Sequence, residues 1–163
     1  MTSEFGAEIN WTRNDARFTG GHYSRGHTWS FDGGQVIAAS ASPHIVPLPH
    51  SVPENVDPEE AYVAALSSCH MLFFLSLAAD RGLIVDSYSD SATGLLSVVD
   101  GVASVTRIDL HPRVTYAGSG ASRELELELH HLAHDRCFLA NSVRTVIETH
   151  VMAARSDGHA GRR

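Results

Sequence analysis

The chain has 163 residues, 43% of them hydrophobic and 19% charged, which is typical of one globular domain. Its formal net charge is −7 with neutral histidines, and its longest basic cluster is the terminal Arg162–Arg163 pair, so we expect no nucleic-acid partner. Two cysteines are too few for a disulfide scaffold.

The chain starts with MTSEFGAEINWTRND, which has no basic start followed by an apolar segment. We therefore expect no signal peptide and a cytoplasmic protein. The most apolar run, residues 61–79, is interrupted by three serines and His70. It looks shorter and more polar than a membrane span, so we expect no membrane association.

The first third of the chain indicates β structure. Residues 7–12 alternate with Ile9 and Trp11 on one side, and residues 27–42 predict a hairpin that turns at the DGG sequence. Residues 43–60 hold five of the six prolines and therefore predict an irregular connection.

A long helix is predicted next. Asp57 is a suitable N-cap, Pro58 suits the first turn, and Glu60 completes a capping-box pattern. Arg81 and Gly82 close the helix. Apolar residues cover most of its circumference, which is typical of a buried helix rather than of an amphipathic one.

Two β runs follow within residues 83–118 and flank a DG turn at 100–101, a strong hairpin signal. A second helix is predicted over residues 121–136, then a turn in FLANS and a last strand over residues 143–154.

These elements predict an α+β fold in which antiparallel sheets surround a long buried central helix and a second helix. We expect a single domain over residues 1–155 and a flexible polar tail over 156–163. One sheet covers one side of a helix that is apolar nearly all round, so a second helix or a second copy of the chain must cover the rest. An intertwined homodimer is therefore expected.

Cys69 lies in the middle of the central helix, between Ser68 and His70. A cysteine there is either a small core residue or a reactive thiol, and a reactive thiol requires a cation that stabilises the thiolate. Cys137 follows 68 residues later, at the end of the second helix. The two cysteines fit a peroxidatic and resolving pair, but their spacing is equally compatible with two unrelated thiols.

The stretch NVDPEEAYVAALSSCHMLFFLSLAADRGL closely resembles the central-helix motif of the OsmC/Ohr family of osmotically induced and organic hydroperoxide resistance proteins. CFLANSVRTVI resembles the second-cysteine motif of that family, and YSRGHTWSFDGG resembles its arginine-bearing hairpin. The resemblance is collinear, covers roughly residues 20–152, and is closer to the OsmC-like branch than to Ohr proper. It implies an OsmC-like fold and a thiol-dependent peroxidase acting on organic hydroperoxides.

Carried over by position, the resemblance implies that Cys69 is the peroxidatic thiol and Cys137 the resolving thiol. It implies that Arg25 stabilises the thiolate and that Glu59 holds Arg25 by paired hydrogen bonds. Ten helical residues separate Glu59 and Cys69 by about 15 Å, so Arg25 must bridge them or one group must come from a partner subunit. We expect no cofactor and no metal, and a thiol reductant whose identity the sequence leaves open.

The substrate pocket is expected to be apolar, which favours organic hydroperoxides over hydrogen peroxide. Candidate lining residues come from the central helix and the proline-rich connection: Met71, Leu72, Phe73, Phe74, Ile45, Val46 and Leu48.

Two other functions remain open. His130, His134 and Cys137 recur at i, i+4 and i+7, a spacing that is compatible with a transition-metal site on one helical face. A non-catalytic module that binds a small hydrophobic molecule is the second alternative.

Overall fold

The computed structural model describes residues 2–152. The chain divides into two units, Met1–Tyr62 and Val63–Arg163, and each is described by itself. The predicted tail, residues 156–163, lies outside the described residues, and the single domain over 1–155 stays a prediction.

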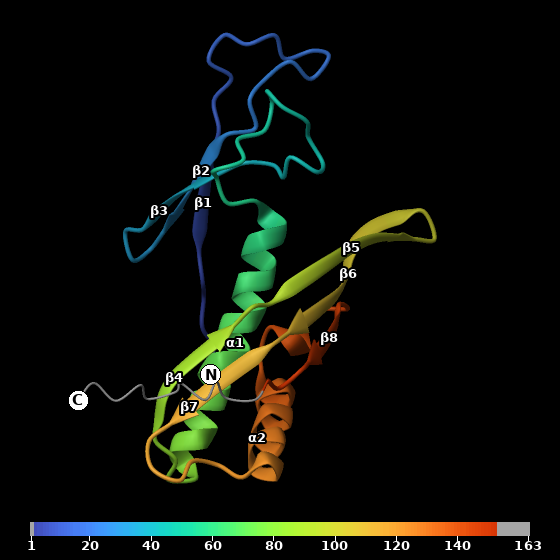
Figure 1. Cartoon of the computed structure of the whole chain (residues 1–163). Helices are drawn as coiled ribbons and strands as arrows, with labels where there is room; N and C mark the ends of the chain where they lie inside the picture. The colour runs from blue at the N-terminus through green and yellow to red at the C-terminus, as the bar shows by residue number, and fades with distance from the viewer. Residues whose placement is uncertain (1, 153–163) are drawn as a thin grey trace, which may run out of the picture. The chain divides into compact units, whose positions relative to one another are not determined.

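The first unit contains an antiparallel sheet in the order β1 (Ala7–Asn10), β2 (His27–Phe31) and β3 (Val36–Ala39) (Figure 1). The predicted hairpin is confirmed, since β2 and β3 pair and Gly34 takes a φ of +84° in the turn. The proline-rich connection forms no regular strand. Its Val56 makes an isolated parallel bridge to Ala39 of the sheet, and Asn55 Nδ2 donates to the Ala39 carbonyl at 3.1 Å.

The helix α1 (Pro58–Asp80) begins and ends at the residues that the sequence indicated. The Glu60 amide donates to Asp57 Oδ1 at 2.8 Å and the Asp57 amide donates to Glu60 Oε2 at 3.2 Å, which is the predicted capping box. At the other end Gly82 has a φ of +71° and the Leu83 amide donates to the Ala78 carbonyl at 3.0 Å, which closes the last turn.

The second unit holds two small sheets. One pairs β4 (Val85–Asp90) with β7 (Pro112–Tyr116), and the other has the order β5 (Thr93–Val99), β6 (Val102–Leu110) and β8 (Val146–Thr149). The hairpin at the DG turn is confirmed, with Asp100 at φ 51° and Gly101 at φ +79° between β5 and β6.

The α+β class is confirmed, and two details differ from the prediction. Each of the two β runs within residues 83–118 divides into two strands, because the chain leaves one sheet for the other between β4 and β5 and again between β6 and β7. β8 pairs with β6 in parallel, so the pairing is mixed rather than purely antiparallel.

The core of the second unit lies between α1, α2 (Arg123–Arg136) and the β4–β7 pair (Figure 1). Ser122 caps α2 by accepting a hydrogen bond from the Leu125 amide at 3.2 Å. The buried core residues come from three elements: Phe74, Leu77, Ala78, Val114, Leu129 and Ala133.

Only one face of α1 is buried in the single chain, contrary to the expectation of burial all round. The buried residues recur at helical spacing and include His70: Leu66, His70, Phe74, Leu77 and Ala78. On another face Leu72 is 60% exposed. The expected cover from a second copy of the chain stays a prediction.

By length and composition alone, α1 meets the criterion for a helix that could cross a membrane, contrary to the sequence expectation. The core helix of a soluble protein meets the same criterion, and Leu66, Phe74 and Leu77 of α1 are buried within the protein. This is weak evidence for a membrane span.

Candidate functional site

Cys69 lines an apolar cavity of about 470 Å³ in the second unit. Six of its lining residues occupy one face of α1, at positions i, i+3, i+4, i+7, i+8 and i+11: Ala65, Ser68, Cys69, Leu72, Phe73 and Ser76. Phe138 and Leu139, which follow α2, form the other wall. The volume is in the usual range for a small-molecule site.

The end of α2 places Cys137 at this wall. Cys137 is the C-cap residue of α2, and its amide donates to the His134 carbonyl at 3.2 Å. The chain then turns through a short 3₁₀ helix, Ala140–Ser142. Asn141 holds this turn because its side-chain amide donates to the carbonyls of Asp135 and Cys137, both at 2.9 Å.

The structure brings the two cysteines together as free thiols. Cys137 is buried and Cys69 is half-buried. Burial, together with a hydrogen bond with Cys69, raises the pKa of Cys137 to about 11. Cys137 therefore keeps its proton at neutral pH.

The predicted lining of the pocket is partly wrong. Leu72 and Phe73 line the cavity, whereas Phe74 lies on the opposite, core-facing side of α1 and Met71 is not part of the wall. The 3.6-residue helical repeat explains this, since neighbours in sequence point about 100° apart. Ile45, Val46 and Leu48 belong to the first unit, and their role stays a prediction.

Arg25 precedes β2 in the first unit and folds back on its own loop. Its Nη1 donates to the Gly21 carbonyl at 2.7 Å and to the Tyr23 carbonyl, and its guanidinium carbon lies 3.8 Å from the centre of the Tyr23 ring. The Arg25 amide also donates to the His50 carbonyl at 2.8 Å. The loop therefore holds the guanidinium by two carbonyls and an aromatic face.

Glu59 lies in the first turn of α1, beside the cap residue Asp57. Among the described residues, no ion pair joins Glu59 to Arg25. Arg25 and Glu59 belong to the first unit and the cysteines to the second. The approach of Arg25 to Cys69 and the role of Glu59 therefore stay predictions.

Sequence reasoning missed a buried histidine pair beside the cysteines. His70 Nε2 lies 3.0 Å from His130 Nδ1, and the two rings stack with centroids 5.3 Å apart. The His130 ring also stacks on the Phe74 ring, with centroids 4.2 Å apart. Burial lowers the pKa of His70 to about 4 and that of His130 to about 3, so both rings are neutral at pH 7.

A signal for this pair was present in the sequence. His70 shares the apolar positions of α1 with Leu66 and Phe74, and His130 follows Leu129 on the apolar stripe of α2. Histidine at a buried helical position requires a polar partner, and a second histidine at an apolar helical position is one candidate for it.

The alternative metal site at His130, His134 and Cys137 is not assembled. His130 turns toward His70, whereas Cys137 contacts Cys69. Within residues 2–152, the three-residue group whose ligand atoms lie within 4.8 Å of one another consists instead of Asp109, Glu148 and His150. The physical reason is that His130 points into the core, while Cys137 caps the helix.

Comparison with known proteins identifies a matching protein family. A family model described as OsmC-like protein matches residues 51–151. A comparison with the curated proteins found no match.

Solved structures share the fold over most of the chain. An OsmC-like protein of unknown function from Vibrio cholerae is 53% identical, with a TM-score of 0.88 over 93% of this chain and 100% of that one. An organic hydroperoxide resistance protein from Elizabethkingia anophelis is 17% identical, with a TM-score of 0.68 over 95% of this chain and 98% of that one. An organic hydroperoxide resistance protein OsmC from Legionella pneumophila is 14% identical, with a TM-score of 0.67 over 95% and 99%.

Proposed function

Because the chain belongs to the OsmC-like family, we propose that it is a thiol-dependent peroxidase that reduces organic hydroperoxides through Cys69 and Cys137. The observation that carries the proposal is the hydrogen bond between the two thiols at the wall of an apolar cavity. Two relatives of the same fold, from Elizabethkingia anophelis and Legionella pneumophila, are named organic hydroperoxide resistance proteins, which supports the same reaction class.

The first step joins sulfur to oxygen. The Cys69 thiolate attacks the terminal oxygen of the hydroperoxide, the O–O bond breaks, and the alkoxide takes a proton and leaves as the alcohol. Cys69 becomes a sulfenic acid, so the sulfur is oxidised by two electrons as the peroxide is reduced. Cys137, which keeps its proton at neutral pH, is suited to supply a proton to the leaving alkoxide or to a neighbouring base.

The second step joins the two sulfurs. The Cys137 sulfur, which gave up its proton in the first step, displaces the hydroxyl of the sulfenic acid. The departing hydroxide takes a proton from solvent and leaves as water, and a Cys69–Cys137 disulfide forms. A dithiol reductant then restores both thiols by exchange. Both sulfurs already lie in contact, so this step demands little movement of the chain.

The thiolate needs a cation, and Arg25 is our candidate for it. Its guanidinium is held by two carbonyls in a loop of the first unit and carries no ion pair among the described residues. A guanidinium that is not neutralised by a carboxylate keeps its full charge for a thiolate. Glu59 would orient Arg25 in the assembled site, as the family resemblance implies.

The cavity favours a substrate with an organic group. Leu72, Phe73, Phe138 and Leu139 supply aliphatic and aromatic surface beside Cys69. Burial of a substrate's apolar group against such walls is worth about 25 cal/mol per Å², and hydrogen peroxide has no apolar group to bury.

The test is to treat the fully reduced protein with cumene hydroperoxide and count free thiols. We expect both thiols to disappear, one equivalent of cumyl alcohol to form, and peptide mapping to recover a Cys69–Cys137 disulfide within one chain. Hydrogen peroxide at the same concentration should react more slowly. Thiols that survive an excess of the hydroperoxide would refute the peroxidase and leave the cavity as a site that binds a small hydrophobic molecule without turnover.

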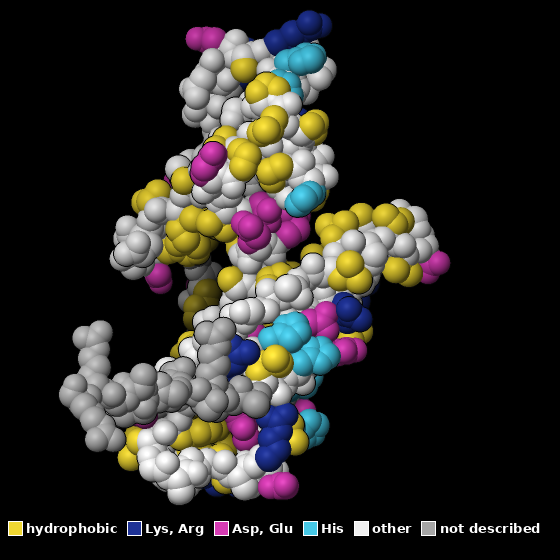
Figure 2. Space-filling model, in the orientation of Figure 1, with side chains coloured by type: hydrophobic (Ala, Val, Ile, Leu, Met, Phe, Trp, Pro, Cys, Tyr) yellow, Lys and Arg dark blue, Asp and Glu magenta, His cyan; other side chains and the backbone are white. Residues whose placement is uncertain are grey.

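We also propose that the protein is a homodimer. The β5–β6 hairpin of the second unit carries a run of exposed apolar residues, visible as the hydrophobic surface of its projecting end in Figure 2: Leu95, Leu96, Val98, Val99 and Val102. Monomeric proteins rarely expose so continuous an apolar surface. The expected mass in solution is that of two chains, and a mass of one chain at micromolar concentration would contradict the proposal.

A further inference from the structure

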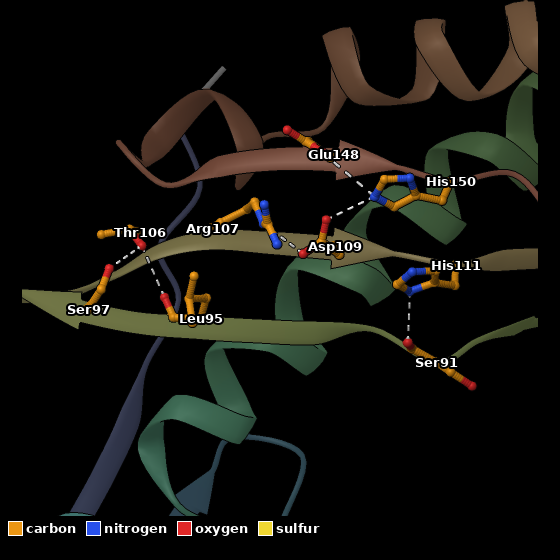
Figure 3. Close-up of polar contacts among 9 residues, drawn as sticks. All are labelled: Ser91, Leu95, Ser97, Thr106, Arg107, Asp109, His111, Glu148 and His150. Carbon is orange, nitrogen blue, oxygen red and sulfur yellow. Dashed lines mark hydrogen bonds and ion pairs between the residues drawn. The ribbon is translucent and has the colours of Figure 1, made fainter.

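Two neighbouring strands of the second unit carry acidic and imidazole side chains in matching positions. β6 and β8 are parallel, and Asp109 is directly opposite Glu148. His111 and His150 come directly after the last residues of β6 and β8, and their rings stack with centroids 5.0 Å apart. Because side chains two residues apart share one face of a sheet, all four groups lie on the same face (Figure 3).

Three of these groups already converge. The Nε2 atom of His150 lies 2.9 Å from Asp109 Oδ1 and 3.7 Å from Glu148 Oε2. We propose that Asp109, Glu148 and His150 form a binding site for one divalent transition-metal cation, with zinc as the best match. We call these three residues the β6–β8 cluster.

The distances fit a metal ion in place of a proton. Tetrahedral ligands bound at about 2.0 Å lie about 3.3 Å from one another, and the distances from His150 Nε2 to Asp109 and to Glu148, 2.9 Å and 3.7 Å, lie on either side of that value. In the metal-free protein His150 donates its Nε2 proton to Asp109. A cation that displaces this proton would be bound by the imidazole nitrogen and by both carboxylates with small side-chain movements.

The groups around the cluster have the arrangement that metal sites use to orient their ligands. Arg107 donates from Nε to Asp109 Oδ2 at 2.8 Å, which leaves Oδ1 directed at His150 (Figure 3). His111 donates from Nδ1 to the Ser91 carbonyl at 3.2 Å, which holds its imidazole ring beside that of His150.

Charge and exposure are suitable for reversible binding. The side chain of Asp109 is 15% exposed, whereas those of Glu148 and His150 are 50% and 45% exposed. The cluster with Arg107 has a formal charge of −1 when the histidines are neutral, so one divalent cation is attracted without a large excess of negative charge. The half-exposed side leaves a coordination position open to water, as in zinc sites with three protein ligands.

The mixed nitrogen and oxygen donors also decide the class of metal. Imidazole favours zinc, nickel, copper or cobalt over calcium and magnesium, and the absence of sulfur from these three ligands separates the site from the two cysteines. The cluster shares no residue with the cavity that Cys69 lines. Binding here is therefore independent of the proposed peroxidase.

The test is a titration of the reduced, metal-free protein with Co²⁺, followed by absorption spectroscopy, and with Zn²⁺, followed by calorimetry. We expect one equivalent to bind with cobalt bands in the visible and without the strong near-ultraviolet band of sulfur-to-cobalt charge transfer. Zn²⁺ should also raise the Tm, because the metal joins β6 to β8 only in the folded protein.

The variants His150→Gln and Glu148→Gln should each weaken binding at least about tenfold. Glu148→Gln is the safer of the two for folding, since Glu148 is half-exposed and, among residues 2–152, its carboxylate pairs only with His150, at 3.7 Å. His131→Gln is the matched control, because His131 and Asp135 form an exposed histidine–carboxylate pair at 3.6 Å outside the cluster, and it should bind as the parent does. A sulfur-to-cobalt band, or equal affinity in His150→Gln, Glu148→Gln and the parent, would overturn the proposal.

Discussion

Replacing Cys69 with serine is expected to lower the rate of cumene hydroperoxide consumption by several orders of magnitude, to the level of free thiol in solution. A serine hydroxyl is not ionised at neutral pH and cannot form a sulfenic acid, so the first step has no nucleophile. Cys69 is half-buried in the wall of the cavity, and residues of its own helix form one side of that cavity. Serine fits the same space, so the fold should persist, and the circular dichroism spectrum and the Tm check this directly.

The matched control is Cys137→Ser. This variant should consume one equivalent of hydroperoxide and then stop, with a sulfenic acid on Cys69 that a cyclic 1,3-diketone traps as a mass increase on the peptide containing residue 69. If Cys69→Ser kept its turnover while Cys137→Ser lost it, the assigned roles would be reversed. If both kept it, the peroxidase would not depend on these thiols.

Lowering the pH from 7 to 4.5 is expected to reduce the free energy of unfolding by on the order of 5 kcal/mol through His70 and His130 together, as an upper bound. For a chain of this length the Tm should fall by on the order of 10 °C. Thermal unfolding followed by circular dichroism at half-unit pH steps measures this dependence.

The free energy of unfolding falls at low pH because the unfolded chain binds more protons than the folded chain. Burial lowers the pKa of His70 to about 4 and that of His130 to about 3, and the nearby His134 also lowers the former while His70 also lowers the latter. In the unfolded chain both rings titrate near 6.5. Between these values the unfolded chain binds protons that the folded chain excludes, so stability is fully present above about pH 6.5 and is lost as the pH falls.

Other groups also titrate in this range, so the assignment needs matched variants. A double variant, His70→Leu with His130→Phe, replaces both partners by apolar side chains of similar size and should flatten the dependence by about two protons, or about 2.7 kcal/mol per pH unit near pH 5. His131→Gln, one residue from His130 on the exposed face of α2 with a side chain 77% exposed, should leave the slope unchanged. An unchanged slope in a folded double variant would show that other groups cause the acid sensitivity.

Several elements could be predicted because their signals are local. The structure confirms five features whose signals each span only a short stretch of sequence: the Asp57–Glu60 capping box, the closure of α1 at Gly82, the DGG hairpin, the DG hairpin and the position of α2. These features depend on backbone preferences and on hydrogen bonds between neighbours in the chain, which do not require the rest of the fold.

The sequence alone determined the class of the fold, the two helices with their caps and the hairpins, and it led to the prediction that Cys69 and Cys137 act as a pair. Only the tertiary structure decided that the helices carrying the two thiols bring the sulfurs into contact and that His70 contacts His130. It also decided that β8 pairs with β6 in parallel, which places Asp109 beside Glu148 and His150. The physical reason is that periodicity states which face of an element is apolar, whereas the partner of that face, 40 to 70 residues away, is selected by packing and by the satisfaction of buried polar groups over the whole core.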